Sequence, residues 1–151
     1  VFFIITGDGE QRPALEAELR RLGIASNFRL PGFIRDVENA MDAFDIGIST
    51  ALWEGLPQSL VQLRLKKKAI VASDIPGNRE VVGDGKNGFL LPAADHDRFA
   101  AAILKLAGDA ELRQKLGGFD AEDFSEWSAD VLVARQEELY QRLLVNSWTG
   151  G

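Results

Sequence analysis

Cysteine is absent from this sequence of 151 residues, and histidine occurs once, as His96. Without cysteine the chain can form no disulfide bridge, thiol nucleophile or thiolate metal site, and it is compatible with a reducing compartment. A single histidine leaves a Ser-His-Asp triad almost no candidates, because that residue would have to be the base and be correctly placed. His96 lies between two aspartates at an expected helix start, so we interpret it as a solvated residue.

The chain also lacks an excess of positive charge and any long apolar run. Lys and Arg total 17 against 23 Asp and Glu, for a formal net charge of −6 at pH 7, without the basic surplus of a nucleic-acid groove. No run approaches the roughly 18 apolar residues of a membrane span, and residues 1–5 show neither a basic region nor a cleavage site. We therefore expect no nucleic acid as partner, no transmembrane segment and a cytoplasmic location.

Short apolar runs recur along the chain, each followed by a Gly, Pro or Asp cluster, a pattern typical of buried strands. Amphipathic stretches lie between them, and in the first of these Leu15, Leu19 and Leu22 share one helical face. This alternation predicts an α/β fold: a Rossmann-like or flavodoxin-like parallel sheet of about five strands with helices on both faces. The expected strands are 1–6, 28–30, 46–49, 69–73 and 89–91.

After Leu91 the pattern predicts helices only, so the C-terminus is expected to be helical. The expected N-caps are Asp95 or Asp97, then Asp109, then Ser125 or Ser128. The length suits a single domain, which we place at 1–145, with 146–151 as a disordered tail.

The last helix carries an apolar stripe formed by Leu132, Leu139, Tyr140 and Leu143. In a lone domain such a stripe would pack on the sheet, whereas in a larger enzyme it could cross to a partner domain.

Two loops follow strands at the edge where open parallel sheets bind ligands, namely 7–10 and 49–59. In the second loop Gly55 lets the backbone come close to a ligand. Glu54 is poorly placed to bind phosphate, but its carboxylate can accept hydrogen bonds from sugar hydroxyls. The helix after this loop is expected to begin near Pro57, which suits a first helical turn.

The free amides of Gln58, Ser59 and Leu60 would point out of that helix start. Together with the helix dipole they are expected to form a phosphate site. A phosphate site beside a sugar acceptor predicts a nucleotide-sugar as ligand.

Three runs, 54–60, 70–82 and 84–91, resemble the C-terminal domain of group 1 retaining glycosyltransferases of the GT-B fold. The resemblance extends in colinear order to Gly7-Asp8-Gly9, to the strand end at 30–33 and to the helix at 109–116, so it covers most of the chain. It implies a domain that binds a nucleotide diphosphate sugar as donor substrate.

The resemblance also implies the roles of individual residues. The base would sit against the backbone of Phe33 and Ile34, the helix after Pro57 would hold the diphosphate, and Glu54 would be the catalytic residue at the donor sugar. The donor-binding set is Gly7, Asp8, Phe33, Ile34, Glu54, Gly55, Leu56, Pro57, Gln58, Ser59, Leu60 and Gln62.

The sequence departs from the family at Gln62, where a second glutamate normally grips the ribose hydroxyls. An amide can accept from one hydroxyl but lacks the charge that roughly doubles the strength of such a bond. Lys66, Lys67 and Lys68 end the same helix, on the order of 12 Å from its start. We interpret them as cations that favour the negative end of the helix dipole, in preference to phosphate ligands.

The family's domain opens with a further strand and helix, which bear an Arg and a Lys that bind the donor phosphates; neither residue has a counterpart here. Without these cations, and without the acceptor-binding N-terminal domain or a partner chain, we expect no sugar transfer by this chain alone. Removing that strand from the order 3-2-1-4-5-6 leaves the flavodoxin-like order 2-1-3-4-5. We therefore expect one compact five-stranded sheet; a central gap filled by another chain is the alternative.

Several residues have two open interpretations. Glu80 either touches the ligand or braces its loop, and Gly7-Asp8-Gly9 is either a ligand loop or only a turn. Trp53 could stack on a sugar or base, but we expect it in the core. No His or Asp cluster has metal-ligand spacing, so we expect no metal and no cofactor.

These observations support three hypotheses. The first is the donor-binding half of a glycosyltransferase that transfers a sugar from a nucleotide-sugar to a glycan or lipid acceptor. The second is a non-catalytic module that binds a nucleotide, a nucleotide-sugar or a partner protein. The third is a structural remnant without a ligand.

Overall fold

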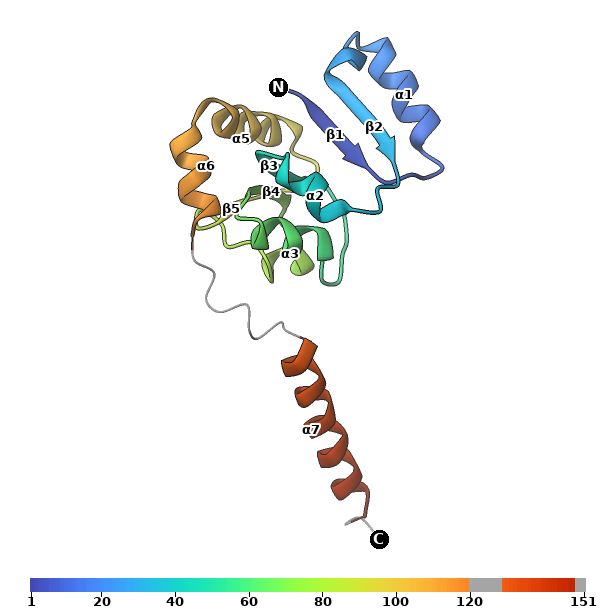
Figure 1. The fold of residues 1–151 in the computed structure, drawn as a ribbon, viewed down its shortest axis with the longest axis vertical. Coiled ribbons are helices and arrows are strands. Elements are labelled where there is room, and N and C mark those ends of the chain that lie inside the picture. Colours follow the sequence, from blue (N-terminus) through green and yellow to red (C-terminus); the bar gives the residue numbers. More distant parts are fainter. Residues whose placement is uncertain (120–128, 149–151) are drawn as a thin grey trace. The chain divides into compact units, whose positions relative to one another are not determined.

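The computed structural model describes residues 1–119 and 129–148, and the chain divides into two compact units, Val1–Phe119 and Asp120–Gly151 (Figure 1). All described strands belong to the first unit. The single domain expected over 1–145 stays a prediction, and the N-cap expected at Ser125 or Ser128 lies outside the described residues.

The first unit alternates strands and helices, which confirms the α/β class. Every strand pair is parallel, and each expected strand is present with ends within about two residues of the prediction. The elements are β1 (Phe3–Thr6), α1 (Arg12–Arg21), the 3-10 helix η1 (Ala25–Asn27), β2 (Phe28–Gly32), α2 (Val37–Asp42), β3 (Ile46–Ser49), α3 (Gln58–Leu65), β4 (Ala69–Ser73), α4 (Pro76–Arg79), β5 (Gly88–Leu91), α5 (His96–Gly108) and α6 (Ala110–Gly117).

The described strands form two sheets, β1-β2 and β3-β4-β5. The expected closure into one five-stranded sheet is therefore wrong, because β1 is not hydrogen-bonded to β3. The connection between the sheets is anchored elsewhere: Met41 of α2 is buried, and Asp42 accepts hydrogen bonds from Lys66 and Lys68 beyond α3. These bonds tie α2, which lies between the two sheets in the chain, to the segment between α3 and β4.

Strand β1 is poorly covered. Ile4 and Ile5 point to opposite faces of the sheet, as successive strand residues do, and both are exposed. Strands of parallel sheets are normally buried on both faces. Phe3 is half-buried and stacks on Phe28 of β2, so the contacts of β1 lie mainly on its β2 side.

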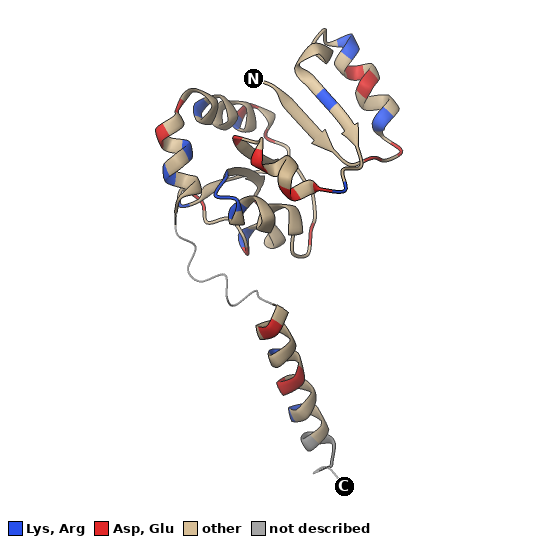
Figure 2. Ribbon diagram, viewed as in Figure 1, with Lys and Arg blue, Asp and Glu red and all other residues tan. Residues whose placement is uncertain are grey.

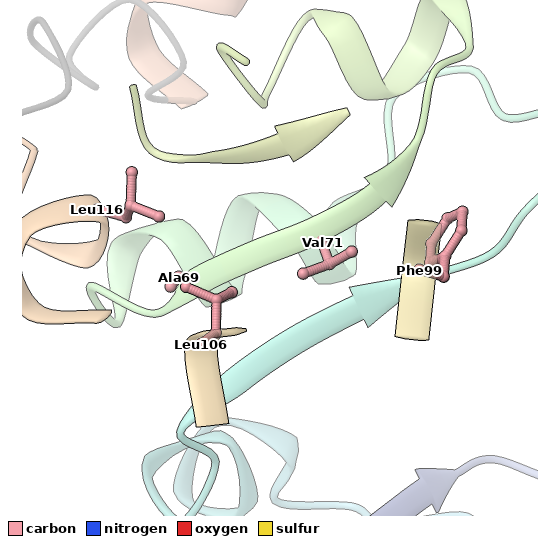
Figure 3. Packing of buried hydrophobic residues seen from close by; sticks show 5 residues of the cluster. All are labelled: Ala69, Val71, Phe99, Leu106 and Leu116. Atoms are coloured by element: carbon pink, nitrogen blue, oxygen red, sulfur yellow. The ribbon is translucent and has the colours of Figure 1, made fainter. Parts of the chain in front are cut away.

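Strand β4 forms the centre of the core, since all five of its residues are buried. On one face, Ala69 and Val71 lie among Phe99 and Leu106 of α5 and Leu116 of α6 (Figure 3). Helix α3 covers the opposite face, to which Ile70 and Ala72 point, and buries its Leu60 and Leu63. This core holds the carboxyl ends of β3 and β4 in place.

Helix starts follow the sequence prediction closely. Asp95 caps α5 by accepting the amide of Arg98 at 3.1 Å, so Asp95 and not Asp97 is the cap. Asp109 caps α6 by accepting the amide of Leu112 at 2.8 Å, as expected. Each bond satisfies one amide at the start of its helix.

The second unit contributes α7 (Ala129–Trp148), which confirms the helical C-terminus and extends three residues into the expected tail. Within it the predicted stripe of Leu132, Leu139, Tyr140 and Leu143 is exposed. Among helices of the described residues, none is both long and apolar enough to span a bilayer.

Candidate functional site

The predicted site residues lie in two groups, one on each sheet. The first group surrounds Gly7 and Asp8 after β1, together with Phe33 and Ile34 after β2. The second follows β3 and includes Glu54. No hydrogen bond or ion pair in the described part of the chain joins the two groups, so the structure assembles each around its own sheet.

Two glycines shape the first group. The amide of Gly7 donates to the carbonyl of Gly32 at 2.8 Å, which ties the end of β1 to the end of β2. Both glycines have positive φ, +103° and +77°, a conformation that other residues rarely adopt. Phe33 follows directly and is 79% exposed, whereas Ile34 is half-buried. The exposed ring leaves a planar surface beside the loop.

Asp8 is held by its own loop and by Arg12. One carboxylate oxygen accepts the amide of Gly9 at 2.9 Å, and the other lies 3.5 Å from Arg12 Nη1. Arg12 also donates to Glu16 at 2.9 Å and to the carbonyl of Leu30 at 2.7 Å. The hydrogen bond to Glu16 is the main cause that raises the pKa of Arg12, so this guanidinium stays charged and orients Asp8.

Sequence reasoning missed Arg12. The signal was present, since Asp8, Arg12 and Glu16 stand four residues apart across a helix start, the spacing of ion pairs on one helical face. In Figure 2 basic and acidic segments accordingly alternate along α1.

The loop between β3 and α3 is open to solvent at its tip. Glu54 and Leu56 are exposed, and a Cβ atom on Gly55 would meet nothing within 4 Å. Trp53 is 84% exposed and its neighbour Leu52 is 72% exposed. The expectation that Trp53 packs in the core is wrong, because β3 ends at Ser49 and Trp53 stands at the exposed tip of the loop that follows.

Helix α3 begins one residue later than expected, with the buried Pro57 as its N-cap. Of the three amides predicted to be free, that of Leu60 donates to the carbonyl of Pro57 at 3.0 Å. This part of the prediction is wrong, because the first turn closes tightly on Pro57. The amides of Gln58 and Ser59 make no hydrogen bond among the described contacts, so two donors remain at this helix start.

Gln62 and the lysines lie further along α3. The side chain of Gln62 is half-buried and makes no hydrogen bond within the described residues. Lys66 Nζ pairs with a carboxylate oxygen of Asp42 at 2.9 Å, a bond that raises the pKa of Lys66. Lys68 Nζ donates to the backbone carbonyl of Asp42 at 2.9 Å. These two lysines anchor α2.

Short helix α4 stands beside the Glu54 loop at the end of β4. Arg79 Nε donates to Asp74 Oδ1 at 2.6 Å, and this bond is the first cause that lowers the pKa of Asp74. The backbone amide of Glu80 donates to the carbonyl of Asn78 at the end of α4. Its exposed side chain makes no hydrogen bond in the described structure, so Asn78 and Arg79 provide the side-chain bonds that hold α4. A ligand contact by Glu80 stays a prediction.

Together these groups offer recognisable chemistry. The two amides of Gln58 and Ser59, at the positive end of α3, suit an anion such as phosphate. Glu54 offers acceptors for hydroxyl groups, and Phe33 and Trp53 offer planar apolar surfaces. Within residues 1–119 and 129–148, no three His, Asp or Glu side chains are grouped so as to hold a metal ion.

Comparison with known proteins gives consistent matches. The family model described as "Glycosyl transferases group 1" matches residues 1–109. The putative glycosyltransferase EpsD of Bacillus subtilis is 28% identical over 91% of this chain. A UDP-Gal:alpha-D-GlcNAc-diphosphoundecaprenol alpha-1,3-galactosyltransferase of Escherichia coli is 29% identical over 73% of it. The chain spans 36% and 29% of those two proteins.

Among solved structures, HepE of Anabaena in complex with UDP is 26% identical, with a TM-score of 0.79 over 93% of this chain and 40% of HepE. The same protein in complex with UDP-glucose matches with a TM-score of 0.66.

Proposed function

Because the chain belongs to the group 1 glycosyltransferases, where it corresponds to the C-terminal domain, we propose that it binds a nucleotide diphosphate sugar as the donor for transfer to a glycan or lipid acceptor. The observation that carries the proposal is the pairing of an exposed carboxylate, Glu54, with the open amides of Gln58 and Ser59 at the start of α3. The two groups suit the two halves of such a donor.

The roles divide by chemistry. The amides of Gln58 and Ser59 hold the diphosphate, because backbone donors and the helix dipole both favour negative charge. In transfer, the same donors would stabilise the charge that develops on the departing nucleotide. Glu54 accepts hydrogen bonds from the donor sugar, and Gln62 accepts from a ribose hydroxyl.

On the first sheet, the base lies against the backbone at Phe33 and Ile34. Gly7 and Asp8 face the ligand from the end of β1, with Asp8 oriented by Arg12. We propose transfer with retention of the anomeric configuration, as the family resemblance implies, and a location in the cytoplasm.

Transfer itself requires more protein than this chain. The chain covers 36% and 40% of two relatives that it matches. We propose that a further domain or partner chain supplies the acceptor site and the cations that neutralise the leaving diphosphate.

Calorimetric titration with UDP and UDP-glucose tests the proposal. Both should bind, and Glu54→Ala should weaken UDP-glucose by about tenfold while changing UDP little, because a hydrogen bond to a charged group is worth about 1.5–3 kcal/mol. Glu111→Ala, at an exposed glutamate in the first turn of α6, is the matched control. Absence of binding by the folded wild type to UDP, UDP-glucose and the corresponding guanosine and adenosine compounds would contradict the proposal.

A second candidate is a non-catalytic nucleotide-binding module. It is favoured by Gln62, which stands where the family has a glutamate and would hold the ribose more weakly. Release of UDP from UDP-glucose by the chain combined with the further domain or partner chain proposed above separates the two, because a purely binding module releases none.

A further inference from the structure

Gly77, the second residue of α4, lies against the backbone of the Glu54 loop. A Cβ atom on Gly77 would come within 2.1 Å of the carbonyl oxygen of Gly55 and 2.5 Å of that of Glu54. Atoms in a packed interior do not approach so closely, and both oxygens belong to the backbone, so the loop would have to move. The φ of Gly77 is not in the left-handed region. This position therefore requires glycine for space alone.

Two buried polar side chains tie α4 to the same strand ends. Ser73 and Asn78 are both 0% exposed. Ser73 Oγ donates to the carbonyl of Ser49 at 3.2 Å, which joins the end of β4 to the end of β3. Asn78 Nδ2 donates to the carbonyl of Ser73 at 2.8 Å. Buried bonds of this kind are costly to leave unmade, so they fix α4 relative to the start of the loop.

We propose that Gly77 is a positioning residue of the donor site. Its missing side chain lets the backbone of Glu54 and Gly55 rest directly on α4. That contact sets where the Glu54 carboxylate stands relative to the open amides of α3, and Ser73 and Asn78 keep the support in place. The inference rests on the proposed function, because it assumes that the Glu54 carboxylate binds the donor sugar and assigns to Gly77 the positioning of that carboxylate.

The role makes a specific prediction for the sugar half of the ligand. Displacement of Glu54 by an added methyl group would weaken contacts to the sugar, whereas the amides of Gln58 and Ser59, held by the buried start of α3, would keep the diphosphate. A merely structural role would weaken both ligands alike. The ratio of the affinities for UDP-glucose and UDP therefore distinguishes the two roles.

The chain provides a closely matched control in Gly117. A Cβ atom there would come within 2.0 Å of the carbonyl oxygen of Lys67, an overlap of the same severity beside the opposite end of β4. Titration of the full chain with UDP and UDP-glucose should show that Gly77→Ala lowers the affinity for UDP-glucose about tenfold more than that for UDP. Gly117→Ala should leave the ratio at its wild-type value.

Two further measurements keep the inference open to refutation. If Gly77→Ala does not fold, Ser73→Ala serves instead, because it removes the bond to Ser49 without adding an atom. This variant should lower the ratio of the affinity for UDP-glucose to that for UDP by about threefold. In the ligand-free protein, the amide NMR signals of Glu54 and Gly55 should shift in Gly77→Ala and not in Gly117→Ala.

The outcomes separate the inference from the proposed function. If the wild type binds both ligands and the variants keep its affinity ratio, the role of Gly77 is overturned while donor binding stands. If the wild type binds neither, the proposed function fails, and unshifted Glu54 and Gly55 signals in Gly77→Ala would overturn the contact as well.

Discussion

Arg79 Nε donates to Asp74 Oδ1 at 2.6 Å, so the residue after β4 is bound to the last residue of α4. This ion pair spans the turn that carries Gly77 against the Glu54 loop. Both side chains are partly exposed, and salt therefore screens their attraction.

The Asp74–Arg79 pair should make stability depend on pH in the acid range. The hydrogen bond from Arg79 lowers the pKa of Asp74 in the folded state. The pair's contribution is thus fully present above the unfolded pKa of about 3.9, and it is lost as the pH falls through the lower folded pKa. Urea unfolding should show Asp74→Asn less stable than wild type at pH 7, with the difference shrinking as the pH falls below the unfolded pKa.

Asp45→Asn is the control, because Asp45 is exposed and forms no ion pair in the described structure. A difference between Asp74→Asn and wild type that stayed constant from neutral to acid pH would contradict this assignment.

Trp53→Ala should weaken ligand binding without loss of stability. The ring is 84% exposed, so its removal should change the free energy of unfolding by about 0.5 kcal/mol or less. An aromatic contact with sugar or base is worth about 0.5–1.5 kcal/mol, which corresponds to about a two- to twelvefold loss of affinity for UDP-glucose. Leu52→Ala provides the comparison; equal losses in both variants would argue against stacking by the indole ring.

Gln62→Glu should strengthen binding of both UDP and UDP-glucose by about three- to tenfold, because a carboxylate accepts a ribose hydroxyl about twice as strongly as an amide does. The gain should disappear with 2′-deoxy-UDP if the 2′-hydroxyl is the donor. Calorimetry with the three ligands measures this. Gln114→Glu, at an exposed residue of α6, adds the same charge elsewhere. An equal gain in that variant would assign the effect to net charge.

Leu106→Ala should destabilise the core of the first unit strongly. Leu106 is 0% exposed and packs with Ala69 and Phe99 under β4, so its truncation should cost about 2–5 kcal/mol in urea unfolding. Leu104, on the same helix, is 64% exposed, and Leu104→Ala should cost about 0.5 kcal/mol or less. Similar losses in both variants would contradict the packing.

Sequence reasoning predicted what depends on local pattern. The apolar run of β4 predicted a buried strand, and Asp109 predicted a helix start, because both follow from residues near each other in the chain. The exposure of Trp53 could not be predicted in this way, because it depends on whether other elements reach the loop, and no element of the described residues covers the ring.

Strand pairing was the other limit. Whether β1 pairs with β3 is decided by contacts between residues far apart in the chain, which a local pattern does not record. The bonds of Asp42 to Lys66 and Lys68, more than 20 residues away, are contacts of this kind. Similarly, the close approach of Gly77 to Gly55 leaves no local signal. The residues of the candidate site could be named from the sequence, whereas the contacts that hold them relative to one another could not.

If the proposed donor binds across both groups of site residues, the separation of the two sheets has a consequence for stability. No backbone hydrogen bonds pair β1 with β3. A molecule that contacted Phe33 with its base and Glu54 with its sugar would therefore bridge the two sheets. Such a bridging ligand would make the β1-β2 sheet unfold together with the β3-β4-β5 sheet, and the free energy of unfolding would rise with ligand concentration. Nucleotides too short to reach both ends would leave the two sheets to open independently.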